Sequence, residues 1–197
     1  MIPNASMSVR EHPSDHEVVF SRLLDAPRKL VWRVWSELEH LHQWFGPFGF
    51  TTTTDEFSFT PGGVWRFIMH GPDGTDYPTR IVFRELDPPS RLVYDNHWDL
   101  PGAPIDFTAV VTMKAEGRRT RFSIHLIFRD AESYRTAVER YGVPDGGIQT
   151  VDRIAGYVEG LAEEYDAKPG IRSAPSGVQV IRREGTTRWN RPRRQHR

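Results

Sequence analysis

Hydrophobic and polar residues alternate through most of residues 17–128, which is the period of a half-buried β-strand. Short turn-forming sequences, such as Pro61-Gly62-Gly63 and Glu116-Gly117, interrupt this alternation at regular intervals. We therefore expect strands at residues 17–24, 50–59, 64–70, 77–86, 91–98, 105–115 and 118–128. Consecutive strands joined by such short turns form an antiparallel meander.

Other segments repeat their hydrophobic residues every three or four positions, as amphipathic helices do. Residues 27–45 show this repeat with a break near residues 36–39, which predicts two short helices after the first strand. A further short helix is expected at residues 130–141, then a link at residues 142–147, then a long helix from Ile148 with one apolar face. Because that face must be covered, we expect an α+β fold in which a curved antiparallel sheet of six to seven strands wraps around the long C-terminal helix.

Alternation also assigns the side chains of each strand to a face of the sheet. Because Arg66, Arg80 and Arg84 should face water, the residues next to them should point inward, toward the long helix. The inward set is rich in aromatic rings, which suits either a ligand pocket or an ordinary core. As a pocket, it comprises Trp65, Phe67, Met69, Tyr77, Ile81, Phe83, Tyr94, Asn96, Trp98, Phe107, Val111, Phe122 and Ile124 from the strands, and Ile148, Val151 and Ala155 from the helix.

The chain of 197 residues has a formal net charge of +0, but its charges are unevenly distributed. Nine Lys and Arg and only two acids lie in residues 166–197, so the remainder of the chain is acidic. This division predicts a flexible leader at residues 1–15, a folded domain at residues 16–165 and a basic, disordered tail at residues 166–197. Nucleic-acid binding through Arg182–Arg197 is the less favoured interpretation of that tail, because a disordered, solubilising extension is the commoner role of such a charged segment. Val178–Ile181 could pair with an edge strand.

Several kinds of chemistry are disfavoured by composition. The chain has no cysteine, which excludes disulfides, thiolate metal sites and a cysteine nucleophile. His70, His97 and His125 fall on alternate predicted strands, about 9.6 Å apart, and point away from the rings, so we expect no metal. No cofactor motif and no catalytic set are found. The inward polar groups Tyr77, Tyr94 and Asn96 supply no base near neutral pH.

No apolar run is long enough to span a bilayer, and residues 1–17 lack the apolar core of a secretory signal. We therefore expect a soluble protein with no membrane span and a cytoplasmic location.

Several motifs together resemble one known family. They are Asp25-Ala26-Pro27, Pro61-Gly62-Gly63-Val64-Trp65-Arg66, Gly71-Pro72-Asp73-Gly74, Pro88-Pro89-Ser90-Arg91-Leu92-Val93 and Gly147-Ile148-Gln149-Thr150-Val151-Asp152-Arg153-Ile154. The resemblance is to the START-like (SRPBCC) superfamily, in the branch of the activator of heat-shock protein 90 ATPase. It implies a helix-grip fold with a hydrophobic cavity between the sheet and the long helix.

Three functions remain open at this point. The first is binding of a small apolar or aromatic molecule in the cavity, without a cofactor. The second is an enzyme of the polyketide cyclase or hydrolase kind that acts in the same cavity. The third is a co-chaperone-like domain that binds a protein partner.

Overall fold

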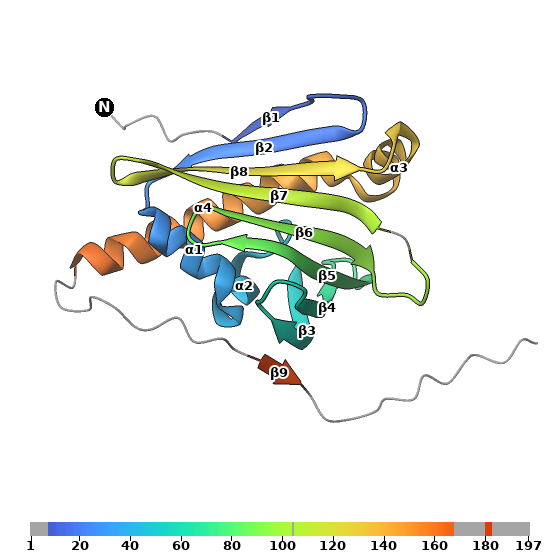
Figure 1. The fold of residues 1–197 in the computed structure, drawn as a ribbon, viewed down its shortest axis with the longest axis horizontal. Helices are drawn as coiled ribbons and strands as arrows, with labels where there is room; N and C mark the ends of the chain where they lie inside the picture. Colours follow the sequence, from blue (N-terminus) through green and yellow to red (C-terminus); the bar gives the residue numbers. More distant parts are fainter. Residues whose placement is uncertain (1–7, 104, 168–179, 183–197) are drawn as a thin grey trace, which may run out of the picture.

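The computed structural model describes residues 8–103, 105–167 and 180–182, and within these residues nine strands form one antiparallel sheet (Figure 1). The order of strands across the sheet is β1-β2-β8-β7-β6-β5-β4-β3-β9. The strands are β1 (Val9–Glu11), β2 (Glu17–Leu24), β3 (Thr51–Ser58), β4 (Val64–His70), β5 (Asp76–Asp87), β6 (Arg91–Trp98), β7 (Ile105–Glu116), β8 (Arg119–Phe128) and β9 (Val180–Arg182). The helices are α1 (Arg28–Ser36), α2 (Leu38–Trp44), α3 (Ala131–Tyr141) and α4 (Val143–Ala167).

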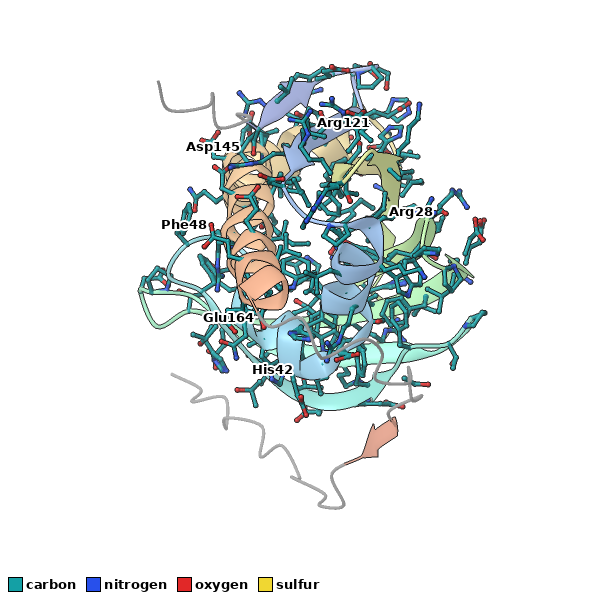
Figure 2. All side chains as sticks on the ribbon, turned by 90° about the vertical axis from the view of Figure 1, so that its left-hand side faces the viewer. Arg28, His42, Phe48, Arg121, Asp145 and Glu164 are labelled. Atoms are coloured by element: carbon teal, nitrogen blue, oxygen red, sulfur yellow. The ribbon has the colours of Figure 1, made fainter. Side chains whose placement is uncertain are left out.

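The predicted α+β, helix-grip architecture is confirmed. Strands β3 to β8 follow one another as an antiparallel meander, and β2 closes on β8, with Phe20 opposite Ile124. The sheet curves around α4, and α1 and α2 fill one end of its concave side (Figures 1 and 2). All seven predicted strands and the two short helices after the first strand are present.

The sheet has more strands than the six to seven predicted. Strand β1 lies in the segment predicted as a leader and pairs with β2, whereas β9 lies in the segment predicted as a tail and pairs with the edge strand β3. Strand β9 overlaps Val178–Ile181, the segment expected to pair with an edge strand, whereas β1 is three residues long, too short for alternation to reveal it. The rest of the basic tail, residues 168–179 and 183–197, lies outside the described residues, as do residues 1–7.

The predicted link at residues 142–147 is wrong, because α4 already begins at Val143. Only Gly142 interrupts the helices: its φ of +58° is left-handed, and its N–H donates to the carbonyls of Ala137 and Val138 to end α3. Pro144 then falls in the first turn of α4, where the missing N–H costs nothing. The chain therefore turns at one glycine and extends the long helix over the end of the sheet.

The core is densest where α1 and α2 meet the sheet. The rings of Trp35 and Trp44 pack edge to face at 4.9 Å between centroids, and the Trp44 indole N–H donates to the carbonyl of Val34 at 3.0 Å. From α4, Val151 and Ala155 are fully buried against the same cluster. Side chains from α1, α2 and α4 therefore fill this part of the concave face.

Candidate functional site

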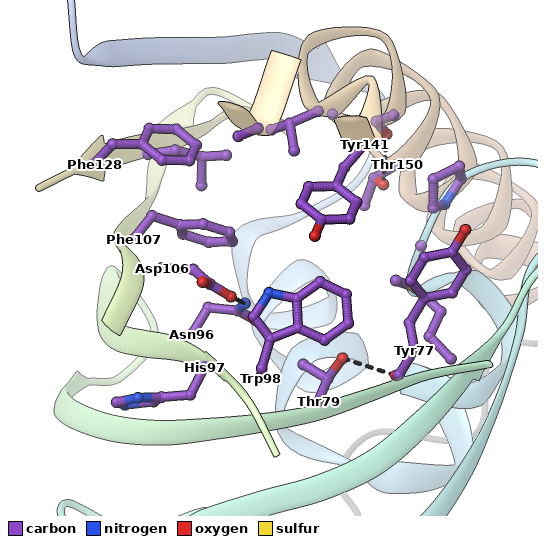
Figure 3. A pocket seen from close by; sticks show the side chains of 18 of the residues that line it. Tyr77, Thr79, Asn96, His97, Trp98, Asp106, Phe107, Phe128, Tyr141 and Thr150 are labelled. Atoms are coloured by element: carbon purple, nitrogen blue, oxygen red, sulfur yellow. Dashed lines mark hydrogen bonds between the residues drawn. The ribbon is translucent and has the colours of Figure 1, made fainter. Parts of the chain in front are cut away.

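A cavity of about 620 Å³ lies between the sheet, α3, the first turns of α4 and the loop of residues 45–50 (Figure 3). This volume is within the range of small-molecule binding pockets. Eight of the sixteen residues predicted as a pocket line it. They are Phe67, Met69, Tyr77, Tyr94, Asn96, Trp98, Phe107 and Ile124.

The other eight predicted residues do not line this cavity. Seven of them are buried in the packed core and are Trp65, Ile81, Phe83, Val111, Phe122, Val151 and Ala155, while Ile148 is partly buried beside that core. The reason is that α1, α2 and the residues following them occupy the concave face there. Phe45 packs on the ring of Trp65 at 4.7 Å, and Phe59 packs on Phe83 at 4.8 Å.

Aromatic rings form the walls of the cavity. Trp98 lies between Tyr141 of α3, at 5.3 Å between ring centroids, and Tyr77, at 6.2 Å. Phe107 and Phe128 pack together at 5.4 Å on the opposite wall. Tyr141 was missed because strand alternation says nothing about which face of the short helix α3 covers the sheet, whereas Phe128 ends β8 on the same face as Ile124 and was left out of the predicted pocket.

Asp106 places a carboxyl group inside this aromatic cavity (Figure 3). Simple alternation would turn it outward, since its neighbour Phe107 points inward. However, Asn96 pairs with Phe107 and His97 pairs with Ile105, so Asp106 is the extra residue of a β-bulge. A bulge re-aims side chains relative to the regular pleat. No feature of the alternation signals it.

The environment of Asp106 changes its protonation. The Asn96 side-chain N–H approaches Asp106 Oδ2 at 3.5 Å, and burial raises the pKa of this carboxyl from 3.8 to about 6. A group with such a pKa accepts and releases protons close to neutral pH. The inward polar groups considered from the sequence were Tyr77, Tyr94 and Asn96, and Asp106 was not among them.

Three further polar groups line the cavity. Burial raises the pKa of Tyr94, so its hydroxyl stays protonated, and no described residue hydrogen-bonds to it. The indole N–H of Trp35 is buried without a hydrogen-bond partner among the described residues. The Thr79 hydroxyl donates to the carbonyl of Tyr77 at 3.0 Å (Figure 3). The Tyr94 hydroxyl could therefore donate to an acceptor on a ligand, whereas the Trp35 N–H is itself enclosed by neighbouring side chains.

Arg153 of α4 holds the loop that forms one side of the cavity mouth. Its guanidinium donates to the carbonyl oxygens of Gly46 at 3.0 Å, Pro47 at 2.8 Å, Phe50 at 3.1 Å and Gln43 at 3.0 Å. One half-buried cation thus bonds several carbonyl groups of the irregular loop backbone. Gln149 of α4 adds a further contact, because its side-chain oxygen accepts from the N–H of Phe48 at 3.0 Å, so two side chains of α4 fix the loop.

The histidines on the strands have separate surroundings. His97 is among the residues that line the cavity, His70 contacts Asp76 and Thr53, and His125 contacts Glu17. Within the described residues, no three His, Asp or Glu side chains come together as metal ligands would. In the same part of the chain, no helix has the length and apolar character needed to cross a membrane.

Comparison with known proteins gives a family match over residues 25–159, to the activator of Hsp90 ATPase homolog 1-like proteins. Among solved structures, a protein from Arthrobacter aurescens is similar with a TM-score of 0.71 and 23% identity, over 77% of this chain and 91% of that one. A protein from Nitrosomonas europaea is similar with a TM-score of 0.65 and 24% identity, over 80% of this chain and 100% of that one.

A third solved structure, the AHSA1 protein from Silicibacter pomeroyi, is similar with a TM-score of 0.60 and 19% identity, over 75% of this chain and 99% of that one. These structural similarities, all below 25% identity, establish the fold. No curated protein matches the sequence.

Proposed function

The chain belongs to the activator of Hsp90 ATPase homolog 1-like family of the START-like superfamily, and we propose that this member binds a small apolar or aromatic molecule in its cavity. The observation that carries the proposal is the cavity of about 620 Å³ walled by rings of Tyr77, Trp98, Phe107 and Tyr141. Removing an apolar ligand from water yields about 25 cal/mol per Å² of buried surface. Hydrogen bonds to the polar side chains that line the cavity, such as Tyr94 and Asn96, would fix the orientation of the ligand.

Native mass spectrometry and calorimetry with small aromatic probes test this proposal. The matched variants are Ala137→Phe and Val138→Phe on α3, because Ala137 lines the cavity whereas Val138 does not and is 37% exposed. We expect naphthalene-sized probes to bind the unaltered protein and the Val138→Phe variant. Ala137→Phe should lose binding by roughly tenfold or more, because the new ring occupies the ligand's volume. Equal binding to both variants would place the probe elsewhere.

A second candidate is an enzyme of the cyclase or hydrolase kind, and the specific observation that favours it is Asp106. With a pKa of about 6, this carboxyl could act as a general base toward a ligand in the cavity. The Tyr94 hydroxyl, whose pKa is raised by burial, would stay protonated and polarise a carbonyl group. Solvent deuterium incorporation into a bound aromatic ketone, lost in Asp106→Asn while binding survives, is the expected sign. Binding without any exchange would leave only the first candidate.

A further inference from the structure

Asp106 lacks the counter-charge that the protein gives to its other buried acid on the neighbouring strand. Asp95, on the opposite face of β6, is 4% exposed, pairs with the guanidinium of Arg84 and accepts a hydrogen bond from Thr108 at 2.8 Å. For Asp106, the 3.5 Å approach of the Asn96 amide is the one polar contact among the described residues. A partly buried carboxylate without a partner costs free energy, which a bound cation would recover.

The surroundings of Asp106 suit a cation with an apolar body. Trp98, flanked by Tyr77 and Tyr141, and the pair Phe107–Phe128 provide aromatic faces in the same cavity. Aromatic faces attract ammonium groups, Trp most strongly, and the attraction grows when water is excluded. A carboxylate beside such rings favours a cationic group and repels an anionic one.

The Arg and Glu side chains around the cavity lie on α3 or, for Arg129, between β8 and α3. Arg129 is engaged with Asp130 at 2.9 Å and with Ser133 at 3.0 Å. Arg140 and Glu132 are exposed, so water screens them and their opposite charges largely cancel. These three residues form the charged rim of the cavity. Inside this rim, the carboxylate of Asp106 is therefore the charge that lies next to a bound ligand.

We propose that the ligand carries an amine or quaternary ammonium group on an apolar or aromatic body, and that Asp106 and Trp98 bind that group. This inference rests on the proposed function of the cavity and names its ligand class. The apolar body would occupy the space between the ring walls, and the ammonium group would complete the environment of the Asp106 carboxylate.

Three probes of nearly equal size separate charge from shape: 1-naphthylmethylamine, 1-naphthalenemethanol and 1-naphthaleneacetate, which are cationic, neutral and anionic. Calorimetric titration of the full chain at neutral pH should show the amine binding about tenfold more tightly than the alcohol, and the acetate more weakly than both. Asp106→Asn should bind the amine no more tightly than the alcohol. Its affinity for the alcohol should stay within about twofold of that of the unaltered protein. Glu132→Gln removes an exposed charge at the rim, and it should change the affinity for the amine and the affinity for the alcohol by no more than about twofold each.

The failure of this inference differs from the failure of the proposed function. If the alcohol and the amine bind equally, or if the acetate binds best, the cavity binds apolar molecules but the ammonium class is wrong. If none of the three probes binds, the cavity itself is not a ligand site. If Glu132→Gln weakens the amine as much as Asp106→Asn does, the preference comes from general charge and the assignment to Asp106 is overturned.

Discussion

A Cβ atom placed on Gly147 would lie 2.4 Å from the ring atoms Cε2 and Cζ of Phe20. Phe20 is fully buried on β2 and lines the cavity, while Gly147 lies in the second turn of α4 and lines the cavity too. The missing side chain at Gly147 is what allows the first turns of α4 to lie directly on the sheet. This contact therefore sets the spacing between helix and sheet at the cavity.

We expect Gly147→Ala to destabilise the protein and to shrink the cavity. The added methyl group must push either α4 or the Phe20 ring, and overpacking of this kind costs about 1–3 kcal/mol. The better helix propensity of alanine recovers up to about 1 kcal/mol of that cost. Urea unfolding should show a net loss of roughly 1 kcal/mol, with weaker binding of aromatic probes.

Gly156→Ala is the matched control on the same helix, because a Cβ at Gly156 meets nothing within 4 Å. It should gain up to about 1 kcal/mol of stability from helix propensity alone and leave probe binding unchanged. If both alanine variants are equally stable, the close approach of Gly147 to Phe20 does not constrain the structure.

The clamp formed by Arg153 predicts a local change in dynamics. Arg153→Gln should free the loop of residues 45–50, because the carbonyls of Gly46, Pro47 and Phe50 lose a charged donor. We expect a loss of about 2 kcal/mol in unfolding free energy and faster amide hydrogen exchange confined to that loop. Arg33→Gln, which removes an exposed ion pair with Glu37, should cost less than about 0.5 kcal/mol. Uniformly faster exchange across the sheet would contradict the local role.

The raised pKa of Asp106 predicts a pH dependence of stability. Because burial raises the pKa of this carboxyl from 3.8 to about 6, the folded state holds its proton over a range in which the unfolded state has released it. The contribution of Asp106 to stability is therefore present at low pH and is lost as pH rises through about 6.

Comparison with Asp106→Asn isolates this effect, because the other ionisable side chains that line the cavity are the same in both proteins: Arg129, Glu132, Arg140, Tyr77, Tyr94 and His97. As pH rises from ~4 to ~7, the unfolding free energy of the variant should increase by about 1–2 kcal/mol relative to that of the unaltered protein. This value is smaller than the pKa shift of Asp106 alone would give, because the carboxyl is only half-buried and water screens it. Urea unfolding at several pH values measures it. A constant difference over this range would mean that Asp106 titrates normally.

Much of the fold could be predicted from the sequence, because the sheet and helices have strong hydrophobic periods. The alternation in β4 and β5 correctly turned Phe67 and Ile81 inward, and the apolar face of α4 correctly placed Val151 against the sheet. What alternation could not provide was the division of the concave face between a filled end and an open end. That division depends on where α1, α2 and α3 lie in space, and nothing in their local sequence specifies it.

The site was harder to predict than the fold for a second reason. Asp106 reaches the cavity through a bulge between β6 and β7, and a bulge breaks the rule on which face assignment depends. As a consequence, the predicted pocket did not include Asp106, the acidic side chain that lies between the aromatic walls. Pairing register, which a single sequence does not reveal, was the missing information.

The open and filled ends of the concave face should respond differently to the same kind of substitution. Phe83 is 1% exposed among Phe57 and Phe59, so Phe83→Leu should cost about 1–2 kcal/mol of stability and leave probe affinity unchanged. Trp98 is only partly buried and borders the cavity, so Trp98→Leu should cost little stability but weaken aromatic probes by roughly tenfold. Chemical unfolding and calorimetric titration of both variants make the comparison. If Phe83→Leu binds the aromatic probe more weakly while its unfolding free energy is unchanged, the ligand reaches the filled end. A side chain that only packs the core would change the unfolding free energy whenever its loss changes affinity.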